Sequence, residues 1–112
     1  MKGLACVLAD RTDPYTRTLV LKGAASVVTE GARFAINLTG SPALAKGGSG
    51  DVLAGAIASL LAEGMSPLAA ARLAVYLHGA AGDRLAATYS TRGVRPSDLP
   101  AAMASLLAEV EP

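Results

Sequence analysis

The sequence predicts a protein of the α/β fold class, with strands in the first third of the chain and helices after them. Two observations carry this prediction: short runs of strand-forming residues before residue 38, and three apolar segments with helix start and stop signals after residue 50. The chain has 112 residues, so we expect a single domain or a domain fragment over residues 1–112.

The first third of the chain carries the strand signals. Gly3–Ala9 is short and apolar, and we expect it to be the end of a helix. Thr18–Leu21 is rich in strand formers and predicts a buried strand. Ser26–Thr29 and Arg33–Asn37, joined through Glu30-Gly31, predict a hairpin. The second hairpin segment alternates between polar or small residues and large apolar ones, which is typical of a half-buried strand.

The chain after residue 50 carries the start and stop signals of three helices. Asp51–Glu63 contains strong helix formers, ends before Gly64, and is apolar nearly all round, so we expect a buried helix. Ser66 precedes Pro67, a favourable cap and first-turn pair for a second helix that continues to about Leu85. Ser97-Asp98 should cap a last helix that ends near Glu109.

The second helix carries three residues of special interest. Gly79 and Gly82 weaken a helix, so we expect them to permit close approach by another backbone. His78 lies on the apolar stripe of the same helix and is the only histidine of the chain. We expect it to be a packed, hydrogen-bonded residue and assign it no role in the chemistry.

Composition narrows the possible functions and surroundings. Hydrophobic residues make up 52% of the chain and charged ones 17%, which excludes a disordered acidic tail. Aromatic residues contribute only 4%, so the apolar surface is made of small side chains, which suggests either a tightly packed helical layer or a piece of something larger. The net charge of +1 gives no sign of nucleic-acid binding, and no run is long enough for a membrane span. The single Cys6 cannot form an internal disulfide, so we expect a cytoplasmic protein.

The most informative segment is Lys46–Leu53, in which three glycines and a serine precede a helix. Backbone N–H groups there can turn toward one point, and the helix N-terminus adds partial positive charge, so this segment predicts an anion or phosphate cradle. Asp51 can accept a proton from a hydroxyl that attacks a phosphoryl group. The alternative is a flexible turn in which Asp51 only stabilises its own helix.

A second candidate follows the apolar strand, at Lys22, Gly23, Ala24, Ala25 and Ser26. Small residues there let a flat ligand lie against the backbone, and the Lys22 ammonium can meet a phosphate. The alternative is a solvated strand-end lysine followed by a turn at Gly23.

Four segments occur in an order that resembles a known family: LVLKGAASVV, INLTGSPALAKGGSGDVLAGAIASLLAEG, AVYLHGAAGDRLA and RPSDLPAAM. Together they are similar to the ADP/ATP-dependent NAD(P)H-hydrate dehydratases of the ribokinase-like superfamily. The resemblance covers the chain from about Thr18 to Ala102. It implies the C-terminal part of a ribokinase-like three-layer α/β/α sandwich, and repair of hydrated NADH or NADPH by phosphoryl transfer to the hydrate hydroxyl followed by loss of phosphate.

The resemblance also implies roles for individual residues. Asp51 matches the base that contacts the hydrated nicotinamide, Gly48, Ser49 and Gly50 match the anion hole, and Gly50 also lies near the nucleotide. The segment from Lys22 to Ser26 matches the nucleotide-binding strand end, and Asn37 and Thr39 match residues that order the loop. ADP or ATP is implied as co-substrate with Mg²⁺ as its companion, and no residue is an evident metal ligand.

Three readings of function follow. The first is the dehydratase, or the C-terminal portion of one, with hydrated NADH or NADPH and a nucleotide as its small-molecule partners. The second is another ribokinase-like kinase, acting on a small alcohol such as a vitamin precursor. The third is a fragment that assembles without chemistry. The predicted strands are too few to cover the apolar surface of the predicted helices, so we also expect a homo-oligomer that buries the remainder. We expect no nucleic-acid or membrane partner.

Overall fold

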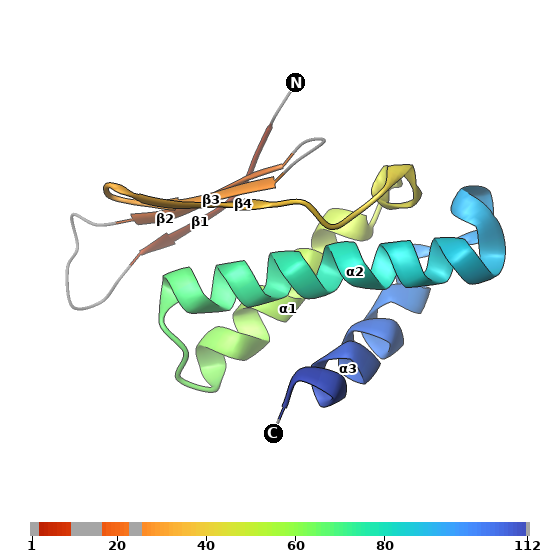
Figure 1. Cartoon of the computed structure of the whole chain (residues 1–112). Helices are drawn as coiled ribbons and strands as arrows, with labels where there is room; N and C mark the ends of the chain where they lie inside the picture. The colour runs from red at the N-terminus through yellow and green to blue at the C-terminus, as the bar shows by residue number, and fades with distance from the viewer. Residues whose placement is uncertain (1–2, 10–16, 23–25, 112) are drawn as a thin grey trace.

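The structure, a computed structural model, describes residues 3–9, 17–22 and 26–111. Four strands form one antiparallel sheet in chain order, and the sheet is followed by two short 3₁₀ helices and three α-helices (Figure 1). The strands are β1 (Gly3–Ala9), β2 (Arg17–Lys22), β3 (Ser26–Glu30) and β4 (Arg33–Asn37). The helices are η1 (Pro42–Leu44), α1 (Ser49–Ala62), α2 (Pro67–Gly93), η2 (Pro96–Asp98) and α3 (Leu99–Val110).

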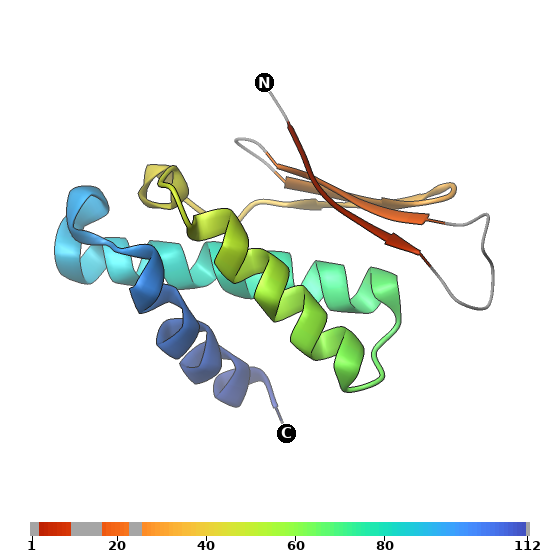
Figure 2. The same ribbon diagram turned by 180° about the vertical axis from the view of Figure 1, so that it is seen from behind.

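The elements form layers. Helices α1 and α2 lie against one face of the sheet, and α3 packs on them on the side away from the sheet (Figures 1 and 2). No element that the structure describes covers the opposite face of the sheet. Among the described helices, none combines the length and the apolar character that a membrane crossing requires.

The prediction of a helix end at Gly3–Ala9 is wrong, because this segment is strand β1. It pairs antiparallel with β2 over most of its length, with Cys6 opposite Val20 and Leu8 opposite Thr18. Seven residues are too few for a stable helix by themselves, whereas pairing with β2 satisfies backbone N–H and C=O groups of both strands.

The predicted strand and hairpin are present in β2, β3 and β4, but the apolar alternation of β4 points away from the helices. Val20 of β2 faces Val28 of β3 and both are buried against the helices. In β4, Phe34 and Ile36 belong to the other face and remain 69% and 57% exposed. The sequence pattern therefore predicted the strand correctly, while its larger side chains lie on the uncovered face.

Helix α1 is not buried all round, which corrects the expectation for this segment. Its buried residues form one stripe along the helix, namely Ser49, Leu53, Ile57 and Leu60. Ala54 and Ala58 are exposed, because the sheet, α2 and α3 leave this side of α1 uncovered. The predicted stop at Gly64 is confirmed by its left-handed backbone, with φ of +98°.

The predicted ends of the other two helices are partly confirmed. The Ser66 hydroxyl accepts a hydrogen bond from the Ala69 N–H at 3.4 Å, so Ser66 caps α2 as expected. The helix extends beyond the expected end at Leu85, with one non-helical residue, Ser90, near its C-terminus. Asp98 precedes α3, but its carboxylate makes no cap bond to that helix and instead accepts from the Arg95 N–H at 3.0 Å.

The core has two parts that share α2. One contains Val20 and Val28 of the sheet together with the buried stripes of α1 and the first half of α2. The other lies between α2 and α3 and includes Leu77, Leu99 and Met103. Helix α2 therefore contacts both the sheet and α3, and its position fixes the position of both.

Gly79 confirms the expected close approach between backbones. A methyl group added at Gly79 would lie 2.1 Å from Thr39 Oγ1 and 2.7 Å from the Thr39 carbonyl carbon. At Gly82 the added methyl would instead meet the Leu44 side chain, at 2.7 Å from its nearest methyl carbon. The segment after β4 therefore contacts α2 so closely that only glycine fits at residue 79.

Replacing Gly79 by Ala should lower the free energy of unfolding by about 1–3 kcal/mol, since the new methyl overlaps fixed backbone. Gly82→Ala should cost less, because the end of the Leu44 side chain can rotate away and alanine favours the helix. Urea unfolding of both variants and the parent chain measures the difference. Equal stability of the parent and Gly79→Ala would contradict the close contact.

Candidate functional site

A cavity of about 560 Å³ opens where the strand ends meet the middle of α2. Its walls come from the end of β2, the start of β3, the segment after β4 and one stretch of α2. Sequence-predicted residues that line it are Lys22, Ser26, Asn37 and Thr39, and His78 and Gly79 of α2 join them. The structure thus brings together residues that are far apart in the sequence.

The Lys22 ammonium lies at the N-terminus of α1. A methyl group added at Gly50 would be 3.1 Å from Lys22 Nζ, so the strand-end lysine and the glycine-rich segment, two separate candidates in the sequence, lie next to each other. The helix N-terminus carries partial positive charge, and Lys22 adds a full charge beside it. Among the residues that the structure describes, none forms an ion pair with Lys22.

Ser49, the first residue of α1, is held by His78. His78 Nε2 lies 2.9 Å from the Ser49 carbonyl oxygen and 3.1 Å from Ser49 Oγ, and both residues are buried. Burial lowers the pKa of His78 and the positive charge of Lys22 lowers it further, against the opposing effect of the hydrogen bond to the Ser49 backbone. The expectation of a packed, hydrogen-bonded histidine is therefore confirmed, and its partner is the glycine-rich segment.

Asn37 and Thr39 fasten the segment after β4 to α2. The Asn37 side-chain amide donates to the Val75 carbonyl and to the Thr39 carbonyl, each at 3.3 Å. The Thr39 hydroxyl lies 3.1 Å from both the Tyr76 carbonyl oxygen and Asn37 Oδ1. The Gly40 N–H donates to the Asp83 carboxylate at 2.9 Å. These bonds are consistent with the predicted ordering of this loop.

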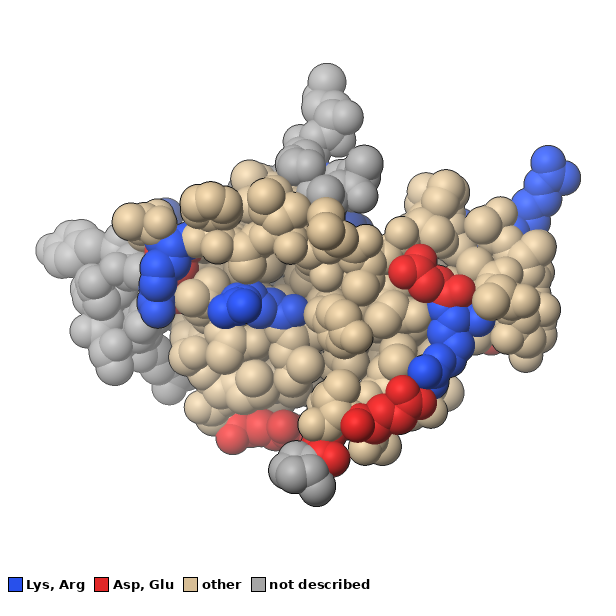
Figure 3. Space-filling model, in the orientation of Figure 1, with Lys and Arg blue, Asp and Glu red and all other residues tan. Residues whose placement is uncertain are grey.

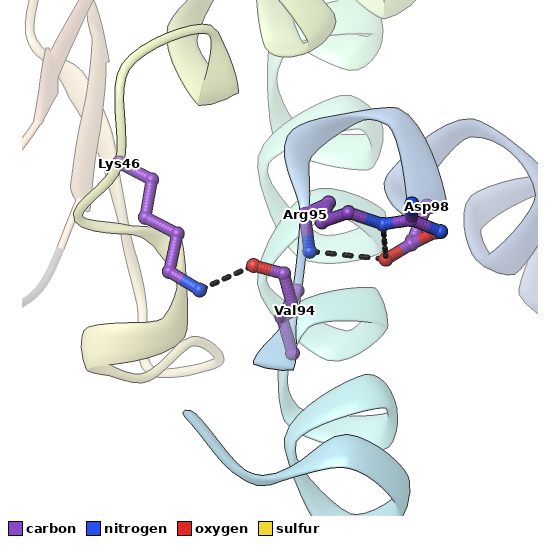
Figure 4. Close-up of polar contacts among 4 residues, drawn as sticks. All are labelled: Lys46, Val94, Arg95 and Asp98. Carbon is purple, nitrogen blue, oxygen red and sulfur yellow. Dashed lines mark hydrogen bonds and ion pairs between the residues drawn. The ribbon is translucent and has the colours of Figure 1, made fainter. Parts of the chain in front are cut away.

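The start of the glycine-rich segment is tied to the region between α2 and α3. Lys46 Nζ donates to the Val94 carbonyl (Figure 4). It also donates to the Arg92 carbonyl at 3.0 Å. Next to this contact, the Asp98 carboxylate accepts from the Arg95 N–H and guanidinium (Figure 4). Its pKa is lowered by these hydrogen bonds, first by the one to the Arg95 backbone. Lys46 was not among the sequence candidates, although its place before the glycines was a signal.

Gly48 occupies the cap position of α1 in a left-handed conformation, with φ of +96°. A methyl group added there would lie 3.5 Å from the Pro96 side chain. The backbone turn before α1 therefore favours glycine at this position, independently of any ligand.

Asp51 is separate from the cavity. It lies in the first turn of α1 with an exposed side chain, and it is not among the residues that line the cavity. Gly48, Ser49 and Gly50 do not line it either, and the α1 N-terminus is connected to the cavity through Lys22, which lies beside Gly50. The predicted residues Gly23, Ala24 and Ala25 lie outside the described residues.

The charged side chains on one face of the molecule are of mixed sign (Figure 3). On the face in Figure 3, acidic and basic side chains lie next to one another. Arg84 and Glu109 form an ion pair at 2.8 Å. Within residues 3–9, 17–22 and 26–111, no three His, Cys, Asp or Glu side chains are grouped so that they could hold a metal ion.

A helix that begins at glycines, beside a strand-end lysine, is an arrangement typical of proteins that bind phosphate groups. The chain belongs to the NAD(P)H-hydrate dehydratase family, whose model matches residues 5–104. The resemblance found from the sequence is therefore confirmed.

The chain is similar to a bifunctional NAD(P)H-hydrate repair enzyme of Moorella thermoacetica, with 45% identity over 102 residues that cover 87% of this chain and 19% of that protein. A repair enzyme of the same description from Vibrio cholerae is 44% identical over 76% of this chain and 17% of its own length. An ADP-dependent (S)-NAD(P)H-hydrate dehydratase of Cenarchaeum symbiosum is 39% identical over 74% of this chain and 29% of its own length.

Among solved structures, the chain resembles the ADP/ATP-dependent NAD(P)H-hydrate dehydratase of Bacillus subtilis co-crystallised with ATP/Mg²⁺. The TM-score is 0.79 at 34% identity, and the match covers 84% of this chain and 34% of the other. The predicted α/β class and carbohydrate-kinase-like fold are thereby confirmed. The chain spans less than a third of the length of the three relatives above.

Acid should destabilise the chain through His78. Its pKa in the folded protein lies below the usual 6.5, so below about pH 6.5 the unfolded chain binds a proton that the folded chain does not. This contribution to stability is complete above that pH and is lost as the pH falls, at up to about 1.4 kcal/mol per pH unit. Urea unfolding between about pH 5 and 7 should show a steeper loss for the parent than for His78→Gln. Identical pH dependence would contradict a neutral, buried His78.

Proposed function

We propose that the chain works in the nucleotide-dependent dehydration of hydrated NADH or NADPH, as the part of a dehydratase that binds the nucleotide phosphates and supplies the base. The reaction transfers a phosphoryl group from ADP or ATP to the hydrate hydroxyl. Phosphate then leaves together with a proton from the neighbouring ring carbon, which restores the dihydronicotinamide. Family membership and the ADP- or ATP-dependent relatives support this proposal.

The observation that carries the proposal is the position of the Lys22 ammonium at the N-terminus of α1. Two positive groups placed together repel each other, and they become favourable when an anion lies between or beside them. A nucleotide phosphate has the charge and the acceptor oxygens that lysine and backbone N–H groups require. The nearby cavity, lined also by Ser26 with its hydroxyl, has room for part of a nucleotide.

Within this proposal, Lys22 to Ser26 bind the nucleotide, and the N–H groups of Gly48, Ser49 and Gly50 hold the transferred phosphoryl group. Asn37 and Thr39 keep the neighbouring loop in place. Asp51 contacts the hydrated nicotinamide and takes the proton of the attacking hydroxyl. Its side chain is exposed in the first turn of α1, so it is accessible to a hydrate that approaches from the solvent.

Mg²⁺ is assigned to the nucleotide rather than to this chain. The described residues offer no group of three suitable side chains, whereas Mg²⁺ is commonly held by nucleotide phosphates together with water. When bound, the ion neutralises phosphate charge. We route no step of the reaction through it.

Gly50→Ala should weaken ADP binding, because the added methyl would lie 3.1 Å from Lys22 Nζ and displace the ammonium. Gly55→Ala is the matched control, since it is a glycine of the same helix with open space around it. It should leave ADP affinity unchanged and raise the free energy of unfolding by about 0.5–1 kcal/mol. Isothermal titration with ADP measures the affinities, and equal weakening by both substitutions would contradict the proposed site.

Asp51→Asn should abolish proton transfer while ADP still binds. The neutral amide cannot accept the proton, so the rate should fall by roughly 10²–10⁴-fold. The return of dihydronicotinamide absorbance from hydrated NADH with ADP or ATP measures turnover. Retained turnover would remove Asp51 from its role, and turnover on thiazole or pyrimidine alcohols instead of the hydrate would favour a small-molecule kinase.

We further propose that the chain is a domain part that assembles as a homo-oligomer in the cytoplasm. The exposed Phe34 and Ile36 on the uncovered sheet face support assembly, because such apolar surface is favourably buried against a partner. A stable monomer in size-exclusion chromatography would contradict it. ADP binding without turnover in a folded oligomer would favour an assembling fragment without chemistry.

A further inference from the structure

We propose that His78 is a positioning residue for the anion site: it fixes the first peptide group of α1 so that the Gly50 N–H keeps its direction beside Lys22. This inference rests on the proposed function, because it concerns the same phosphate-binding helix N-terminus. It gives a specific task to a buried residue that belongs to α2 and not to the glycine-rich segment itself.

The hydrogen bond between His78 and Ser49 has a defined direction. A carbonyl oxygen only accepts, so the His78 Nε2 that lies 2.9 Å from the Ser49 carbonyl oxygen must carry a hydrogen and donate it. The Ser49 hydroxyl oxygen, 3.1 Å from the same nitrogen, is a second acceptor within reach. Only 4% of His78 is exposed, so water does not compete for this bond. His78 is thereby held with its hydrogen on Nε2.

Fixing the Ser49 carbonyl also fixes the next N–H group. The peptide bond is planar and trans, so the carbonyl of Ser49 and the N–H of Gly50 belong to one rigid unit and point in opposite directions. A bond to the carbonyl therefore sets the direction of the N–H. The Gly50 backbone is next to the Lys22 ammonium, so this N–H belongs to the group of donors around the proposed phosphate.

His78 is itself held in place by the cavity wall. The neighbouring Gly79 is pressed against Thr39, and Asn37 donates to the Val75 carbonyl one turn earlier in α2. The same stretch of α2 thus carries the loop after β4 on one side and the start of α1 on the other. The hydrogen bond from His78 therefore holds the Ser49–Gly50 peptide group, which would contact the anion, in a fixed position relative to α2.

The test compares His78→Gln, whose terminal amide can still donate from a similar position, with His78→Leu, which cannot donate. Leu77→Ala is the control, since Leu77 is buried toward α3 and its loss destabilises the chain without touching Ser49. Two measurements are made on each folded variant: the affinity for ADP by isothermal titration, and the exchange rate of the Gly50 amide by NMR.

We expect His78→Leu to weaken ADP binding by about tenfold, the size of one lost buried hydrogen bond, and to speed Gly50 exchange. His78→Gln should retain most of the affinity, and Leu77→Ala should lose stability with no change in either measurement. Equal loss in the Gln and Leu variants, or parent-like behaviour of His78→Leu, would overturn the proposal. If His78→Leu does not fold, His78→Asn replaces it, because its shorter amide cannot reach Ser49.

The two proposals fail in different ways. If the parent chain binds no ADP, the proposed function is wrong, and the exchange measurement decides the role of His78 by itself. Faster Gly50 exchange in the variant without a donor, with parent-like exchange in His78→Gln and Leu77→Ala, would then support the positioning role. Unchanged exchange in all variants would overturn it.

Discussion

The close contact between one turn of α2 and two distant segments is the constraint on which the rest of the structure depends. Gly79 leaves no room between α2 and Thr39, and His78 of the same turn donates to Ser49 at the start of α1. The strand ends and the glycine-rich segment thus share one rigid support. Without it, the cavity would have no fixed shape, because its walls come from separate parts of the chain.

This support places a lysine beside a helix N-terminus in a protein of low net charge. The net charge is only +1, and the surface mixes acidic and basic groups, yet the sheet delivers Lys22 to the positive end of α1. The lowered pKa of His78 is consistent with that environment, since burial and the nearby positive charge of Lys22 both disfavour a charged imidazole. The backbone geometry brings these two positive groups together, and the composition of the chain does not reveal this arrangement.

The sequence predicted the features that depend on neighbouring residues. The hairpin, the Ser66 cap and the stop at Gly64 follow from local turn and cap chemistry, and they agree with the structure. Features that depend on distant partners were not predictable from the same signals: β1 is a strand because it pairs with β2, and the exposure of Phe34 depends on which sheet face the helices cover. The candidate site divides in the same way. The glycine-rich segment was evident in the sequence, whereas the bond from His78 to Ser49 joins residues 29 positions apart.

The bonds from Asn37 to Val75 and from Gly40 to Asp83 span 38 and 43 positions, respectively. The sheet, in contrast, joins each strand to the next one in the chain. Closing a long loop costs more conformational entropy than closing a hairpin, and such contacts form late because the loop must close before they can stabilise it. The cavity therefore depends on contacts with a higher loop-closure cost than those of the sheet. A chain whose sheet and individual helices have formed still lacks the site until α2 docks.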